Sequence, residues 1–192
     1  MPQHERVSGH WMSFHEEGWN KPSQMTDKVY EALRFAEEKH KGQLRDDGQP
    51  YFKHITDVVD ILLENGDGWE QNLIIAALHD TLEDTDTTYE ELNEKFGKEA
   101  AEGVRLLTKS EGEPFDEYAN RIFNDEGEVY VATIKLADRL ANLYDLPFCG
   151  NPEKIRRYLA ETKRCILTQR CCPELKNKIV SEVKKMENLE TD

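Results

Sequence analysis

Residues 74–85 constrain this chain more than any other segment, because an apolar run ends there in a concentration of ionisable groups. The segment reads Ile-Ile-Ala-Ala-Leu-His-Asp-Thr-Leu-Glu-Asp-Thr, so His79 and Asp80 close the apolar run, and Glu83 and Asp84 follow one helical turn later. Residues three and four apart share a helix face, which would gather an imidazole and three carboxylates. Such carboxylates repel one another unless a proton or a cation compensates them. The segment therefore predicts a metal site at the end of a helix.

The bulk composition allows one domain with a sizeable core and argues against several partners. A chain of 192 residues can bury such a core. No apolar run approaches the ~20 residues of a membrane span, so we expect no membrane partner. The net charge of -14 argues against a nucleic-acid partner. Four cysteines without a C-x-x-C pair, and an N-terminus without an apolar signal segment, predict reduced thiols and a cytoplasmic location. Whether the chain forms a homo-oligomer is left open.

Helical periodicity recurs along the chain, and no segment reads convincingly as a sheet. The expected helices cover about residues 26–40, 54–64, 69–82, 88–96, 98–108, 115–123, 129–143 and 152–172, with a last one after Pro173. Thr26 is a plausible N-cap, and Thr87 to Glu90 has a capping-box pattern. The β-branched start of residues 129–143 could be a strand, but its leucine-rich continuation favours one buried helix. We expect an all-α bundle, with residues 1–22 as an N-terminal arm and residues 23–192 as a single domain.

Two further residues complete a set of ligand type around His79 and Asp80. His54 follows a Gly- and Pro-containing loop, and Asp138 lies on an otherwise apolar helix. Two imidazoles and two carboxylates suit a divalent first-row metal, and they do not suit a closed structural zinc site. Taken singly, each residue has a structural explanation, such as pairing of Asp138 with a neighbouring arginine. Taken together, the four favour a metal centre.

Three motifs recur in order along the chain: Gly42-Gln43-x-Arg45 with Pro50-Tyr51-x-x-His54, Ala77-Leu78-His79-Asp80-x-x-Glu83-Asp84-Thr85, and Lys135-Leu136-Ala137-Asp138-Arg139-Leu140-x-Asn142-Leu143. Their pattern resembles the HD-domain phosphohydrolases, and more closely the hydrolase part of the Rel/SpoT-type alarmone synthetase/hydrolases. The resemblance spans about residues 26–165. Because the chain ends where a synthetase domain would begin, it is similar to the small, hydrolase-only alarmone hydrolases.

The resemblance implies an enzyme of the (p)ppGpp 3′-pyrophosphohydrolase type, which acts on a small nucleotide and depends on one Mn²⁺ per subunit. The implied metal ligands are His54, His79, Asp80 and Asp138. The implied catalytic residues, which would orient and deprotonate the attacking water, are Glu83 and Asp84. Those expected near the substrate are Arg45, Asp46, Asp47, Lys135, Arg139, Asn142, Lys154 and Tyr158. For Tyr158, packing in the core is an equal alternative.

One position departs from the family pattern and leaves the substrate open. After the motif arginine the family usually has Lys and a small polar residue, whereas this chain has Asp46-Asp47. Acids there would repel a polyphosphate unless they face solvent or accept from a base or a ribose hydroxyl. The adenine alarmones ppApp and pppApp therefore stand beside ppGpp and pppGpp. The alternatives are an HD-type phosphatase for NADPH or another nucleotide, and a catalytically silent nucleotide sensor.

Overall fold

The computed structural model describes residues 25–125, 128–169 and 171–189, so the predicted arm of residues 1–22 lies outside the described residues. The α-helices are α1 (Asp27–Lys39), α2 (Phe52–Glu64), α3 (Glu70–Leu78), α4 (Thr81–Asp84), α5 (Tyr89–Phe96), α6 (Lys98–Leu107), α7 (Phe115–Asn120), α8 (Val129–Asp145), α9 (Pro152–Glu161) and α10 (Pro173–Leu189). Short helical turns follow three of them, namely π turns over Arg121–Asp125 and Thr162–Ile166 and a 3-10 turn over Leu146–Phe148. Within these described ranges the β pairing amounts to one isolated bridge, between Leu44 and Pro50. The all-α prediction is confirmed.

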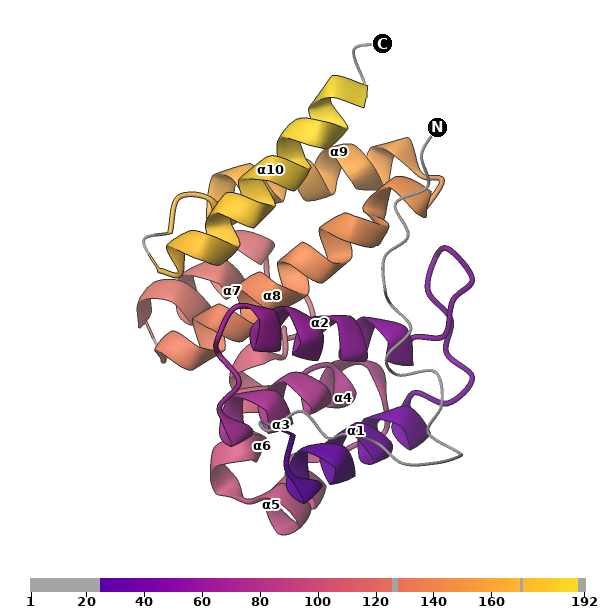
Figure 1. The fold of residues 1–192 in the computed structure, drawn as a ribbon, viewed down its shortest axis with the longest axis vertical. Helices are drawn as coiled ribbons and strands as arrows, with labels where there is room; N and C mark the ends of the chain where they lie inside the picture. The colour runs from indigo at the N-terminus through magenta and orange to yellow at the C-terminus, as the bar shows by residue number, and fades with distance from the viewer. Residues whose placement is uncertain (1–24, 126–127, 170, 190–192) are drawn as a thin grey trace.

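The long helix α8 lies at the centre of the bundle (Figure 1). It packs against α2 and α3 on one side and against α10 on the other, while α1 and α6 pack against α3. Leu136, Leu140 and Leu143 are fully buried, as expected for a helix with neighbours on several sides. The β-branched start of α8 is helical, and the Thr133 hydroxyl donates to the Val129 carbonyl at 2.9 Å. None of the described helices has the length and apolar content needed to cross a membrane.

Two helix starts follow the capping signals in the sequence. The Thr26 hydroxyl accepts from the Val29 N–H at 3.4 Å and starts α1. The Thr88 hydroxyl accepts from the Glu91 N–H at 3.2 Å and starts α5, so the cap lies one residue after the Thr87 of the predicted box. Caps of this kind stabilise a helix by about 0.5–2 kcal/mol.

The structure corrects two predicted helices. The helix expected over residues 69–82 is interrupted, because Asp80 adopts φ -97° and ψ -2° and the Thr81 hydroxyl donates to the Leu78 carbonyl at 2.7 Å. The prediction that residues 79–84 share one continuous helix face is therefore wrong. The helix expected over residues 152–172 ends in the π turn at Ile166, well before Cys172.

Candidate active site

The four residues of ligand type meet at one point, although they come from three separate parts of the chain. His54 lies in the first turn of α2, His79 and Asp80 lie at the break between α3 and α4, and Asp138 lies in the middle of α8. The His54 Nε2 atom is 3.2 Å from Asp138 Oδ1 and 3.5 Å from Asp80 Oδ2. The His79 Nε2 atom is 2.9 Å from Asp80 Oδ2 and 3.9 Å from Asp138 Oδ1. The predicted cluster is thus assembled in space.

The environment of the imidazoles fits a metal centre. The Nδ1 atom of His79 lies 2.8 Å from the Ala76 carbonyl, which fixes a proton on Nδ1 and directs Nε2 towards Asp80, so that Nε2 is the atom that could bind a metal once it is deprotonated. This Nε2 atom is buried and makes no aligned hydrogen bond. A metal-binding histidine usually donates its other ring N–H to a carbonyl or carboxylate, which fixes the tautomer and the ring orientation. His54, His79 and Asp80 each direct a ligand atom at this point, all within 4.8 Å of one another.

The electrostatics of the cluster also call for a cation. Burial opposes a charged imidazolium at His79, but the Asp80 and Asp138 carboxylates outweigh it and raise the pKa of His79 to about 9. Burial likewise opposes ionisation of Asp80, yet the neighbouring histidines hold the pKa of that carboxyl well below its usual range. Without a metal, a proton on His79 therefore balances the buried carboxylates. A divalent ion would take the place of that proton, since metal ligands must be deprotonated.

Two side chains of α8 orient Asp138. The Lys135 ammonium donates to Asp138 Oδ2 at 2.7 Å, and the Asn142 amide donates to Asp138 Oδ1 at 2.5 Å. Burial works against the charge on Lys135, but Asp138 more than compensates and raises the pKa of the lysine. Lys135 also lies 4.9 Å from the centroid of the Tyr118 ring. Lys135, predicted near the substrate, thus contacts a residue of the candidate metal cluster directly.

The second carboxylate pair lies beside the cluster and opens to solvent. Glu83 Oε2 accepts from the Lys109 backbone N–H at 2.9 Å, and partial burial raises the pKa of Glu83. The Tyr51 hydroxyl lies 2.7 Å from Asp80 Oδ2 and 2.9 Å from Asp84 Oδ2, so its one proton serves two carboxylates. Tyr51 stands in the first sequence motif without a predicted role and Lys109 lies outside the three motifs, so only their contacts in the fold identify them.

Two connected hollows surround these groups. A cleft of about 490 Å³ contains the Asp80 and Asp138 carboxylates, the Glu83–Asp84 pair, and the cations of its walls. These cations are Lys109, Lys135, Arg139, Lys154 and Arg157. A smaller pocket of about 240 Å³ lies beside it, towards the loop that joins α1 to α2. The residues that line both hollows are Tyr51, Asn142, Lys154 and Tyr158.

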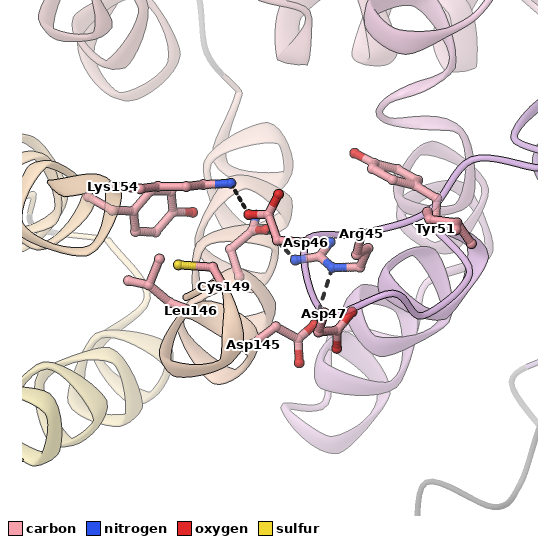
Figure 2. Close-up of a pocket in the computed structure, with 11 residues that line it drawn as sticks. Arg45, Asp46, Asp47, Tyr51, Asp145, Leu146, Cys149 and Lys154 are labelled. Carbon is pink, nitrogen blue, oxygen red and sulfur yellow. Dashed lines mark hydrogen bonds and ion pairs between the residues drawn. The ribbon is translucent and has the colours of Figure 1, made fainter. Parts of the chain in front are cut away.

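The smaller pocket contains cations that are already paired with acids (Figure 2). The Arg45 guanidinium donates to Asn142 Oδ1 at 2.9 Å and lies 3.3 Å from Asp145 Oδ2. Lys154 reaches across from α9 and forms an ion pair with Asp46 on the α1–α2 loop. Asp47 has another contact, since its Oδ1 atom accepts from the Gln49 backbone N–H at 3.0 Å and closes a turn.

All eight residues expected near the substrate line one of the two hollows. Arg139 is only 2% exposed, with its guanidinium 3.9 Å from the Tyr158 ring centroid and 4.6 Å from that of Phe115. It therefore supports the aromatic wall of the cleft, and its contact with substrate remains a prediction. Burial raises the pKa of Tyr158 to about 12. Arg157 is an exposed cation of the cleft that the sequence reading missed, because nothing in its local pattern distinguishes it from a solvated residue.

Comparison with known proteins agrees with this geometry. A family model for the HD domain matches residues 32–116. The chain is 39% identical over 144 residues to a guanosine-3′,5′-bis(diphosphate) 3′-pyrophosphohydrolase of Aquifex aeolicus, which covers 72% of this chain and 20% of that protein. It is 34% identical over 149 residues to the bifunctional (p)ppGpp synthase/hydrolase SpoT of Escherichia coli, covering 73% and 21% of the two chains. The chain thus spans about a fifth of the length of these bacterial relatives.

A small animal relative matches over most of its length. The chain is 39% identical over 129 residues to the pyrophosphohydrolase MESH1 of Danio rerio, with 65% of this chain and 72% of that protein covered. A solved structure of a metazoan SpoT ortholog that hydrolyzes ppGpp superposes with a TM-score of 0.75 at 27% identity. That match covers 84% of this chain and 97% of the other. The chain therefore belongs to the family of HD-domain guanosine-3′,5′-bis(diphosphate) 3′-pyrophosphohydrolases.

Proposed function

We propose that this chain is a Mn²⁺-dependent hydrolase that removes the 3′-pyrophosphate from ppGpp and pppGpp, and from their adenosine counterparts. The observation that carries the proposal is the convergence of His54, His79, Asp80 and Asp138 at one point, with the two carboxylates lining a cleft that also contains five cations. The names of the relatives support a guanosine 3′-pyrophosphate as substrate. We further propose that residues 23–192 form the catalytic domain. A cytoplasmic location is also proposed, because the four cysteines are free thiols.

In this proposal, metal binding and proton transfer are carried out by different side chains of the site. The four converging side chains would hold the ion, and a bound divalent ion lowers the pKa of its water and neutralises phosphate oxygens. Glu83 and Asp84 would take the proton from the attacking water, since both open to the cleft beside the cluster. Tyr51, with its hydroxyl between Asp80 and Asp84, would keep the acceptor carboxylate apart from the ligand carboxylate.

The two hollows would bind different parts of the substrate. Lys109 and Arg157 line the cleft and have no acid partner among the described side chains, so the cleft suits the phosphate groups. Both cations of the smaller pocket, Arg45 and Lys154, form ion pairs with acids, so this pocket suits an uncharged nucleoside. Asn142 lines both hollows and would contact the sugar between them.

A substrate panel tests this proposal. The purified full chain is stripped with EDTA and supplied with Mn²⁺ or with Mg²⁺, and then incubated with ppGpp, ppApp or NADPH. We expect pyrophosphate release from ppGpp with Mn²⁺, and none after EDTA treatment. Release of orthophosphate from NADPH alone would overturn the proposal in favour of a nucleotide phosphatase. Tight nucleotide binding without turnover of any compound would indicate a sensor.

The Asp46–Lys154 pair predicts a measurable effect on substrate affinity. Lys154 lines both hollows, so an incoming phosphate would have to displace Asp46 from it. An exposed ion pair contributes about 0.2–1 kcal/mol, so Asp46→Asn should lower KM for ppGpp by about 1.4- to 5-fold and leave kcat unchanged. Asp47→Asn is the matched control, because Asp47 lines the same pocket but bonds Gln49. Equal effects of the two variants would indicate only a general charge effect.

A further inference from the structure

Two adjacent cysteines lie outside both hollows of the candidate active site. Cys171 and Cys172 form the connection that leads into α10, and both are partly exposed. Both are free thiols. Cys171 borders a separate surface hollow with Phe123 and Gln169, so reagents can reach the pair from solvent. Nothing in the proposed hydrolysis uses these sulfur atoms.

The backbone at Cys172 is held in an unfavourable conformation. Its φ is +46°, and no other non-glycine residue in the described ranges has a positive φ. A side chain with a Cβ atom rarely adopts this region, and Pro173 follows directly, which restricts the backbone further. Such strain persists only where surrounding contacts impose it, and it is concentrated at functional positions. Here the contact is with α8, where the Cys172 sulfur lies 2.9 Å from the Thr133 hydroxyl oxygen.

The Thr133 hydroxyl on α8 can donate a hydrogen bond to the Cys172 sulfur. Thr133 has one hydroxyl proton and two acceptors within reach, the Val129 carbonyl at 2.9 Å and the Cys172 sulfur. When Cys172 is a thiol it can donate to the Thr133 oxygen; when it is a thiolate, the hydroxyl can turn its proton to the sulfur. Cys171 directly precedes Cys172 in the chain, so a second thiol stands next to this sulfur. Cys172 is therefore the sulfur of the pair whose thiolate has a positioned donor.

Several neighbouring groups act on the pKa of Cys172 in opposite directions. The Cys171 thiol lowers this pKa most and the Thr133 hydroxyl lowers it further, whereas burial and the Asp67 carboxylate raise it. Together they lower the pKa of Cys172 to about 6. Interaction with the Cys172 sulfur and burial both raise the pKa of Cys171, and the nearby Lys176 charge offsets only part of this rise. The pKa of Cys172 is thus lower than that of Cys171, so Cys172 is the first of the two thiols to lose its proton.

We propose that Cys171 and Cys172 form a site of oxidation by hydroperoxides, in which Cys172 is the attacking sulfur and Cys171 the resolving thiol. The Cys172 sulfur attacks one peroxide oxygen and the O–O bond breaks. The sulfur becomes a sulfenic acid, and the departing hydroxide or alkoxide takes a proton from water. The Cys171 sulfur then attacks the Cys172 sulfur, water leaves with the Cys171 proton, and a disulfide joins the two neighbours. The sulfur atoms lose two electrons, which the peroxide gains.

Peptide mapping tests this site without any activity assay. Trypsin should place both cysteines in one peptide, residues 171–176, and Cys165 and Cys149 in two others. After equimolar hydrogen peroxide, we expect the wild-type peptide 171–176 to lose two hydrogens. Cys171→Ser should stop at a sulfenic acid that dimedone traps on Cys172, and Cys172→Ser should leave Cys171 reduced. Oxidation of Cys149 or Cys165 as fast as the pair, or of Cys171 in the Cys172→Ser variant, would overturn the proposal.

Alkylation kinetics give a second test that does not depend on removing a cysteine. At pH 6 roughly half of a thiol with a pKa of about 6 is ionised, a far larger fraction than for an unperturbed small thiol. A thiolate of low pKa is, however, a weaker nucleophile than one of ordinary pKa. We therefore expect Cys172 to react about tenfold faster than an unperturbed small thiol at this pH. Thr133→Val should move the pH midpoint of this reaction upward, because the thiolate loses a donor. Thr133→Ser should restore it. A midpoint that Thr133→Val leaves unchanged would contradict the assigned role of the hydroxyl.

Discussion

Replacing Asp80 with alanine is expected to abolish metal retention and pyrophosphate release together. Asp80 Oδ2 lies within 3.5 Å of the ring nitrogens of both His54 and His79, so it is the common neighbour of the proposed ligands. Its removal leaves two buried imidazoles facing Asp138 alone, and a three-donor remnant should not keep the ion through purification. Metal content measured by atomic absorption and initial rates with ppGpp check the two parts separately.

Thermal unfolding provides a readout of the same change that needs no turnover. Mn²⁺ at 100 times its dissociation constant should stabilise the wild-type protein by about 2.7 kcal/mol. For a domain of this size that corresponds to a rise in Tm of roughly 5–10 °C. The Asp80→Ala protein should show no such rise. Asp86→Ala is the matched control, because Asp86 is exposed and pairs with Lys39 away from the cluster. An Asp80→Ala protein that retains one metal per chain would exclude this ligand set.

Converting Glu83 to Gln and Asp84 to Asn in one protein should lower kcat by about 10²- to 10⁴-fold while the metal remains bound. Both changes keep the side-chain shape and remove the ability to accept a proton. The amide oxygen of the glutamine can still accept from the Lys109 N–H, and that of the asparagine can still accept from Tyr51. The loss should therefore fall on proton transfer and leave the fold of the cleft intact. Single-turnover rates and metal content provide the measurement.

The single variants decide which of the two carboxylates takes the proton. If Glu83→Gln alone reproduces most of the loss, Asp84 acts mainly in positioning the water, and the reverse result exchanges the roles. Glu90→Gln on α5 is the control, because it is an exposed glutamate outside both hollows. A double variant that loses its metal would show that the pair belongs to the ligand set, contrary to the division proposed above.

The spatial cluster was within reach of the sequence because its members stand at motif positions on strongly periodic helices. His54 precedes, His79 follows and Asp138 interrupts a set of apolar residues, so burial of those residues brings the polar ones inward with them. The helical class also followed from periodicity, since α2 and α8 bury apolar side chains in successive turns. These features depend on local pattern, which a single sequence contains.

Other features depend on tertiary contacts that no local pattern reveals. The break before Thr81 comes directly after the apolar run that His79 and Asp80 close, and Leu82 continues the helical spacing of apolar residues, so periodicity alone predicts an unbroken helix. The role of Tyr51 requires knowing that two carboxylates from α4 and its N-cap face the start of α2. The pairing of Asp46 with Lys154 joins residues 108 positions apart. Sequence identified both as candidates for substrate contact but could not show that they bind each other.

The side-chain amide of Asn142 forms hydrogen bonds through both its oxygen and its nitrogen. Its oxygen accepts from Arg45 in the smaller pocket, and its nitrogen donates to Asp138 in the metal cluster. Because an amide group is planar and rigid, displacement of one end moves the other. We therefore expect occupancy of the smaller pocket to affect Asp138, a proposed metal ligand, through this single residue. Thermodynamic linkage makes any such effect mutual, so that whatever nucleotide binding does to metal affinity, metal binding does to nucleotide affinity by the same factor.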